Sequence, residues 1–188
     1  VVWGIRTALV DYPWDKRTSA LAAQVEALLA PLADCVIANS QAGAALWRRK
    51  LGSCNKLSYV ANGIDTQSFT VEPWIRNAAR SELGFDDDEE VIGIVGTLSP
   101  MKDHGTFLEA AALLSRRLPS ARFLCVGGEE PGMEHYALAI RHRASELGLK
   151  GIVQWLGDRS DVPRLIAALD LLTSSSRREG SSNVIAEG

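Results

Sequence analysis

Two glutamates near the end of the sequence flank a turn that could bind an anion. Glu179 precedes a Gly-Ser-Ser-Asn turn, and Glu187 follows in an apolar, helix-forming stretch. Ser182 or Asn183 is a suitable N-cap for that helix, whose first N–H groups and positive dipole end would suit a phosphate. A carboxylate beside a bound anion needs hydroxyl groups or a developing positive charge as its partner. A sugar nucleotide supplies both.

Backbone amides of this turn are the candidate phosphate donors. They belong to Gly180, Ser182, Asn183 and Val184. Gly180 could be an ordinary turn glycine, and that is compatible with a backbone N–H that binds phosphate. The cluster predicts an anion cradle with one carboxylate on each side.

The composition excludes a few classes of function. Of the 188 residues, 46% are hydrophobic and 23% are charged, and the net charge is −3, as in ordinary globular proteins. Lysines and arginines form no stripe, so nucleic acid is not an expected partner. The three cysteines form no CxxC pair, which leaves zinc chemistry unsupported and fits a reducing cytoplasm. The three histidines show no metal-ligand spacing and are expected at the surface, so no metal site is predicted; they are His104, His135 and His142.

Short apolar runs alternate with longer helical patterns along the chain. Strands are expected at 34–39, 57–60, 91–95, 122–126, 152–156 and 169–173, and helices at 41–51, 74–83, 104–118, 134–147 and 162–168. Strands that are apolar on both faces and separated by helices indicate a parallel sheet covered on both sides. The loops that follow the strands would then converge at the carboxyl edge, where open α/β sheets bind ligands. A break near residues 62–69 suggests a hinge between two α/β units.

Five motifs, in this order, resemble the retaining glycosyltransferases of family 4, also called group 1. They are residues 33–40, residues 60–65 with Phe69, residues 95–102, residues 156–158 through Val162, and the two spaced glutamates. The resemblance implies the α/β GT-B architecture, in which a parallel Rossmann-type sheet flanked by helices binds the donor. Residues 1–62 would be the tail of the acceptor-binding domain, and residues 63–188 an incomplete donor-binding domain. We therefore expect a fragment of a longer protein.

The resemblance also assigns roles to charged residues. The Gly96 loop would meet the donor phosphates, and Lys102 would stabilise the negative charge that grows on the leaving diphosphate. Glu187 would accept hydrogen bonds from the ribose hydroxyls. Glu179 would lie near the transferred sugar, where it holds a hydroxyl or stabilises positive charge on the ring.

Two further positions are less specific. Asp158 and Val162 lie on the loop where the family often places the base, although a solvated loop would explain them equally well. Thr97 stands where the family usually carries an arginine. Thr97 could hydrogen-bond the phosphate while Lys102 acts alone, or Arg177 or Arg178 could supply the missing cation.

The resemblance predicts a metal-independent, retaining hexosyltransferase that needs no cofactor. Its partners would be a nucleotide-diphosphate sugar and a glycan, lipid or small-molecule acceptor. The protein would be cytoplasmic, and parts outside these residues could attach it to the inner face of a membrane. A sugar-nucleotide epimerase of the same architecture and a non-catalytic nucleotide-sugar binding module remain alternatives, the latter favoured by Thr97. An NAD-dependent dehydrogenase is disfavoured, because no GxGxxG follows any expected strand.

Overall fold

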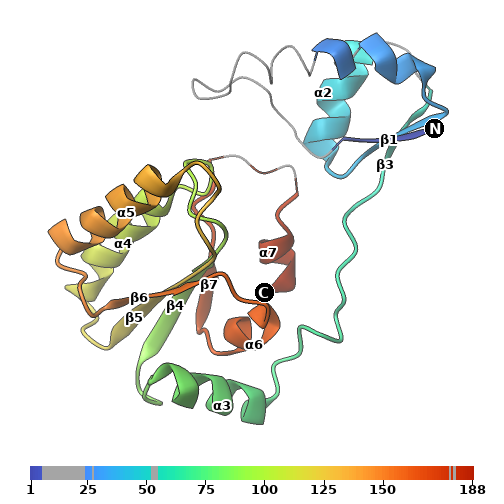
Figure 1. The fold of residues 1–188 in the computed structure, drawn as a ribbon. Coiled ribbons are helices and arrows are strands. Elements are labelled where there is room, and N and C mark those ends of the chain that lie inside the picture. The colour runs from blue at the N-terminus through green and yellow to red at the C-terminus, as the bar shows by residue number, and fades with distance from the viewer. Residues whose placement is uncertain (6–23, 27, 52–54, 178, 180) are drawn as a thin grey trace. The chain divides into compact units, whose positions relative to one another are not determined.

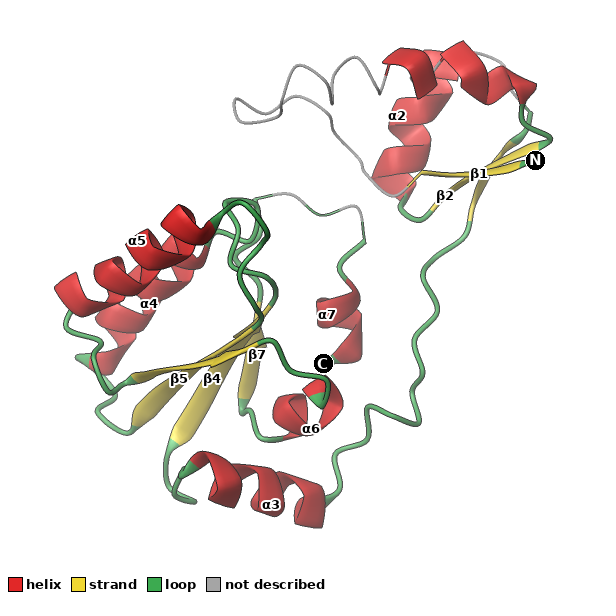
Figure 2. Ribbon diagram, viewed as in Figure 1, coloured by secondary structure: helices red, strands yellow, loops and turns green. Residues whose placement is uncertain are grey.

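The described part of the chain divides into two compact α/β units. The computed structural model describes residues 1–5, 24–26, 28–51, 55–177, 179 and 181–188. The first unit contains residues 1–63 and 178–183, and the second contains residues 64–177 and 184–188. Each unit has its own parallel sheet and helices, shown as yellow arrows and red ribbons in Figure 2.

The first unit is built on a short parallel sheet. Its strands β1 (Val2–Ile5), β2 (Cys35–Ala38) and β3 (Leu57–Tyr59) pair in the order β1-β2-β3. The single-turn helix η1 (Ala30–Leu32) precedes β2, and the helix α2 (Gln41–Leu51) follows it. Ser40 begins α2, because its Oγ accepts a hydrogen bond from the Gly43 N–H at 3.0 Å. Trp47 of α2 packs in a core with Val36 and Ala38.

The second unit contains a four-stranded parallel sheet. Its strands are β4 (Glu90–Val95), β5 (Ala121–Val126), β6 (Val153–Gly157) and β7 (Leu171–Thr173), in the spatial order β6-β5-β4-β7. Its helices are α3 (Pro73–Leu83), α4 (His104–Ser115), α5 (Glu134–Glu146), α6 (Val162–Ala167) and α7 (Asn183–Glu187). The chain first builds the sheet outward from β4 to β6 and then returns to the other side of β4.

Helices cover both faces of this second sheet (Figure 1), so the expected two-sided burial is confirmed. Successive side chains of a strand point to opposite faces. Ile92 and Phe123 face α4 and α5, where Phe123 meets Phe107 edge to face at 6.0 Å between ring centroids. Val91 and Leu124 face the other way and pack with Leu165 of α6.

The expected elements are confirmed with small changes at their ends. The helix α4 ends at Ser115 rather than at 118, and α5 ends at Glu146. The strand β1 was missed because a few apolar residues at the start of the sequence show no alternation. Its pairing with β2 depends on residues more than thirty positions away.

Candidate functional site

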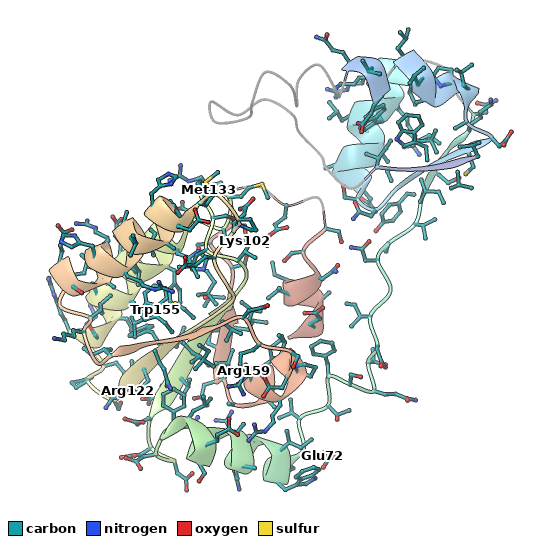
Figure 3. The ribbon with its side chains drawn as sticks, in the orientation of Figure 1. Glu72, Lys102, Arg122, Met133, Trp155 and Arg159 are labelled. Carbon is teal, nitrogen blue, oxygen red and sulfur yellow. The ribbon has the colours of Figure 1, made fainter. Side chains whose placement is uncertain are left out.

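The strand order predicts a ligand position beside β4. The order in which strands are added to the second sheet reverses between β4 and β7. The chain continues from β4 to β5 on one side and returns to β7 on the other. Ligands of open parallel sheets bind outside the carboxyl ends of the strands at such a switch point. The loops that follow β4 and β7 are therefore the first candidates for a binding site. Figure 3 shows Lys102 at this carboxyl end of the sheet.

Glycines allow the loops after β4 and β5 to meet backbone to backbone. Gly127 has a φ of +143°, and a Cβ atom added there would lie 2.1 Å from the Gly96 carbonyl oxygen. Only glycine fits such an approach. The Gly96 N–H donates to Val126 O at 2.8 Å, and the Leu98 N–H donates to Gly128 O at 2.8 Å. These contacts fix the backbone that follows β4.

The loop after β6 joins the same cluster. The Gly127 N–H donates to Gly157 O at 2.8 Å, and a Cβ atom on Gly128 would lie 3.2 Å from Asp158 Cβ. The convergence of these loops, expected from the strand and helix pattern, is thus present in the second unit.

Lys102 lies across the first of these glycines. A Cβ atom on Gly96 would lie 3.1 to 3.3 Å from three carbons of the Lys102 side chain, so the lysine stem covers the glycine. The Lys102 N–H donates to Ser99 O at 3.1 Å in a turn. Thr97 is exposed on the same loop. The loop after β4 therefore carries a cation held close to its own backbone.

Asp103 links this loop to the start of α4. It has left-handed backbone angles, with φ of 49°, and it caps the helix through Thr106. Burial works against its charge, but hydrogen bonds from Arg177 and Thr106 outweigh burial and lower the pKa of Asp103 below its usual range. Arg177 Nε lies 2.7 Å from the Asp103 carboxylate, whereas Arg178 lies outside the described residues. Of the two candidate replacements for a cation at position 97, Arg177 is the one the structure describes.

His104 is buried, so the expectation that it lies at the surface is wrong. Its side chain has 0% exposure, and among the described residues neither ring nitrogen completes a hydrogen bond. Burial, followed by the positive charge of Lys102, lowers the pKa of His104 to about 4, against a smaller opposing effect of the Asp103 charge. A neutral imidazole therefore lies beneath the Lys102 loop. No pattern in the sequence indicates this burial, since a histidine at a helix start is equally compatible with exposure to solvent.

The loop after β6 has a charged network beside Asp158. Asp158 is exposed, and Val162 begins α6 and packs against the core. Arg159 Nε donates to Asp161 Oδ1 at 2.7 Å, and this hydrogen bond lowers the pKa of Asp161 to about 2. Arg159 also reaches Glu82 of α3 at 3.3 Å. Arg159 therefore ties this loop to a neighbouring helix.

The acidic turn at the end of the chain is divided between the two units. Glu179, Ser182 and Asn183 belong to the first unit, and Gly180 lies outside the described residues. The other two expected site residues, Val184 and Glu187, lie on α7 in the second unit. This helix has five residues, and its end approaches β7, since a Cβ atom on Gly188 would lie 2.4 Å from a Leu172 methyl group.

Within the described residues, no group of three histidine, cysteine, aspartate or glutamate side chains is arranged to hold a metal ion. A search of that same part of the chain for a helix long and apolar enough to cross a membrane also finds none.

The second unit has a Rossmann-type fold, and the loop cluster at the carboxyl edge of its sheet is the candidate ligand site. Residues 75–188 match the family described as glycosyl transferases group 1. Because this match covers more than half of the sequence, the chain belongs to the group 1 glycosyltransferase family.

Individual relatives agree with this assignment. The chain is 31% identical over 168 residues to the putative glycosyltransferase EpsD of Bacillus subtilis strain 168, a match that covers 87% of this chain and 42% of EpsD. It is 33% identical over 135 residues to the D-inositol 3-phosphate glycosyltransferase of Mycobacterium sp. strain KMS, which covers 71% of this chain and 29% of that protein.

Solved structures show the same fold. Anabaena HepE, in complex with UDP and glucose, matches 99% of this chain and 49% of its own, with a TM-score of 0.85 and 29% identity. WaaG, a glycosyltransferase involved in lipopolysaccharide biosynthesis, matches with a TM-score of 0.73 at 19% identity over 99% of this chain and 53% of its own. These neighbours are GT-B glycosyltransferases, so the expected fold class is confirmed. The chain spans less than half the length of EpsD and of HepE.

Proposed function

We propose that residues 63–188 form part of the donor-binding domain of a retaining family 4 glycosyltransferase, and that residues 1–62 belong to its acceptor-binding domain. The protein would transfer a hexose from a nucleotide-diphosphate sugar to a glycan, lipid or small-molecule acceptor without a metal ion. HepE was crystallised with UDP and with UDP-glucose, which supports a uridine diphosphate hexose as the donor.

The observation that carries this proposal is the placement of Lys102 at the switch point. A cation there would meet the diphosphate at the carboxyl edge of the sheet, as the ligand position of open parallel sheets requires. Its charge would stabilise the leaving diphosphate as the glycosidic bond breaks, when negative charge grows on the phosphate oxygens. In this proposal the Gly96 loop carries Lys102, and the absence of a side chain on Gly96 lets the lysine stem lie over the loop backbone.

The remaining roles follow the family resemblance. Glu187 would accept hydrogen bonds from the ribose hydroxyls, and Glu179 would face the transferred sugar. Asp158 and Val162 would border the base. Gly180, Ser182, Asn183 and Val184 would offer N–H groups to the donor.

Substitution of Lys102 tests the proposal. In the whole protein, Lys102→Ala should weaken UDP binding roughly 10- to 100-fold, because a hydrogen bond to a charged group contributes roughly 1.5 to 3 kcal/mol. Glu187→Ala should weaken binding of UDP more than binding of inorganic pyrophosphate, since pyrophosphate lacks ribose. Calorimetric titration with UDP, GDP and ADP measures both effects and the preference for the base.

Matched controls use charged residues away from the loop cluster. Lys150→Ala and Glu109→Ala replace exposed residues of the same types and should leave UDP binding unchanged. Normal UDP affinity and normal turnover in both Lys102→Ala and Glu187→Ala would show that the proposed site is wrong.

A non-catalytic nucleotide-sugar binding module is the second candidate. Thr97 favours it, because this exposed residue supplies no charge to a leaving diphosphate. If the whole protein binds UDP-glucose but releases no UDP, and Thr97→Arg then produces glycoside and UDP, this second candidate is correct.

A further inference from the structure

Residues that follow β7 form hydrogen bonds with the backbone of the loop that carries Lys102. The Arg177 N–H donates to Met101 O at 3.0 Å. Ser175 Oγ lies 2.9 Å from Lys102 O and 2.9 Å from Asp103 O. Three successive carbonyl groups of the β4 loop are therefore contacted by two residues of the β7 loop.

The Ser175 hydroxyl bridges two of these carbonyls with a single proton. A serine has one O–H donor, so the hydroxyl shares its proton between Lys102 O and Asp103 O. Three-centre bonds of this kind restrain both peptide groups at once. These carbonyls belong to the two peptide groups that flank the Asp103 Cα, and neither group can rotate without losing this contact.

Arg177 adds an ion pair to the same region. Its Nε lies 2.7 Å from Asp103 Oδ2, and Thr106 Oγ1 donates to the same oxygen at 2.9 Å. The Arg177 side chain is 51% exposed, so the ion pair contributes little to folding by itself. Its effect is to fix the direction of the chain at Asp103, which already has left-handed backbone angles.

These contacts hold the backbone and the stem of Lys102. The backbone of Lys102 is held from the β7 side, and its stem lies over Gly96 on the β4 side. We propose that Ser175, Arg177 and Asp103 form a latch that positions Lys102 for the donor diphosphate. This inference rests on the proposed role of Lys102, and the latch residues act through that lysine rather than on the reacting atoms.

An ordinary helix cap does not account for the latch. Asp103 caps α4 through Thr106 alone, and Ser175 and Arg177 are not needed for that cap. Ser175 and Arg177 contact the carbonyls of the residues that precede the helix. The loops that follow β4 and β7 meet at the switch point of the sheet. They are thus joined at Lys102, the residue that carries the positive charge.

Ser175→Ala is the main test, because it removes one hydroxyl and little volume. In the whole protein, UDP affinity measured by calorimetry should fall about 3- to 10-fold, the effect of one neutral hydrogen bond. Uridine, measured by its competition with UDP, should bind as before, since it has no phosphate for Lys102. The thermal midpoint should stay unchanged, and Ser175→Thr, which keeps the hydroxyl, should restore UDP affinity.

Two further variants separate the ion pair from the hydroxyl. Asp103→Asn keeps an oxygen for the Thr106 N–H but removes the charge, and Arg177→Gln removes the guanidinium; each should weaken UDP binding to a similar degree. Arg143→Gln is the matched control, because Arg143 makes exposed ion pairs with Glu109 and Glu146 on helices of the same unit. It should bind UDP normally.

A double substitution shows whether the latch acts through Lys102. Ser175→Ala should cause no further loss in a Lys102→Ala background, because the positioned group is already absent. Additive losses, or equal weakening of UDP and uridine by Ser175→Ala, would overturn the latch. Normal UDP binding by Ser175→Ala together with weak binding by Lys102→Ala would also overturn it while leaving the proposed function intact. Normal binding by Lys102→Ala itself would count against the proposed function.

Discussion

Lys102 and Gly96 depend on each other at the level of single residues. The lysine stem occupies the space that a side chain at position 96 would need. Any larger residue there would push the lysine away from the loop. The spacing between these two residues, which supported the family resemblance, therefore has a direct steric meaning in the structure.

His104 gives a prediction about pH. The pKa of this buried imidazole is lowered from 6.5 to about 4 in the folded protein, chiefly by burial. As the pH falls from 6.5 to 4, the unfolded chain takes up a proton that the folded chain excludes, so the folded state is progressively disfavoured. The free energy of unfolding should fall by about 3 kcal/mol across this range, given 1.36 kcal/mol for each pKa unit.

Urea unfolding at several pH values measures this effect. His104→Gln should remove most of the dependence between pH 6.5 and 4, because the variant has no imidazole to titrate. His142→Gln is the control, since the side chain of His142 is 75% exposed. An unchanged pH dependence in His104→Gln would show that another group is responsible.

Single residues were also the hardest to predict from the sequence. The types and spacing of Gly96, Lys102 and the two glutamates were sufficient to suggest a donor site. Burial of His104 could not be predicted, because it depends on how α4 begins beneath the β4 loop. The pairing of Arg177 with Asp103 joins residues 74 positions apart, and no local pattern records it.

At the scale of elements, a buried arginine joins α3 to the strands at the end of the sheet opposite the site. Arg80 is 2% exposed, and its guanidinium donates to the carbonyl oxygens of Ala168, Asp86 and Glu89 and to the carboxylate of Asp170. Asp170 also accepts the Val91 N–H at 2.8 Å. This cluster connects the starts of β4 and β7 to the helix.

Arg80→Met should destabilise the second unit without affecting donor binding. Removal of the guanidinium leaves the carbonyl groups of Ala168, Asp86 and Glu89 without this donor, while Asp170 keeps Arg76 and the Val91 N–H as partners. A buried acceptor left unsatisfied costs about 1 to 3 kcal/mol. Chemical denaturation measures the loss, and UDP titration of the folded variant should give the normal affinity. Arg143→Met, which breaks exposed pairs, should have little effect, and an equally small effect of Arg80→Met would contradict this prediction.

Most helices and strands could be predicted because local pattern controls them. The run Val91 to Val95 is apolar on both faces, which indicates a strand covered on both sides, and β4 has that environment. Element ends were less certain. The Arg80 cluster was not predictable, since its partners come from segments up to 90 residues away in the sequence.

At the scale of the whole molecule, each unit has a core made of its own residues. Val36 and Trp47 lie in the core of the first unit, and Leu124 lies in a core of the second. Trp155 packs against the other core of the second unit. A truncation in one core should therefore act mainly on the unit that contains it.

Tryptophan fluorescence can test this separation. Variants that retain only Trp47 or only Trp155, with the other tryptophans changed to phenylalanine, report on one unit each. Leu124→Ala should lower the urea midpoint seen by Trp155, with a cost of about 2 to 5 kcal/mol for a buried leucine. Val36→Ala should lower the midpoint seen by Trp47. Equal shifts of both probes by both substitutions would show that the chain unfolds as one unit.

The backbone approach at Gly127 has a consequence for how freely this chain can vary. A codon change at position 127 introduces a Cβ atom 2.1 Å from a main-chain oxygen, which cannot move aside as a flexible side chain could. The glycines after α3 and α5, Gly84 and Gly148, also have positive φ but have no atom within 4 Å of an added Cβ, so asparagine can replace them. In a saturation library selected for folding, position 127 should be depleted of every amino acid other than glycine. Positions 84 and 148 should retain several other amino acids.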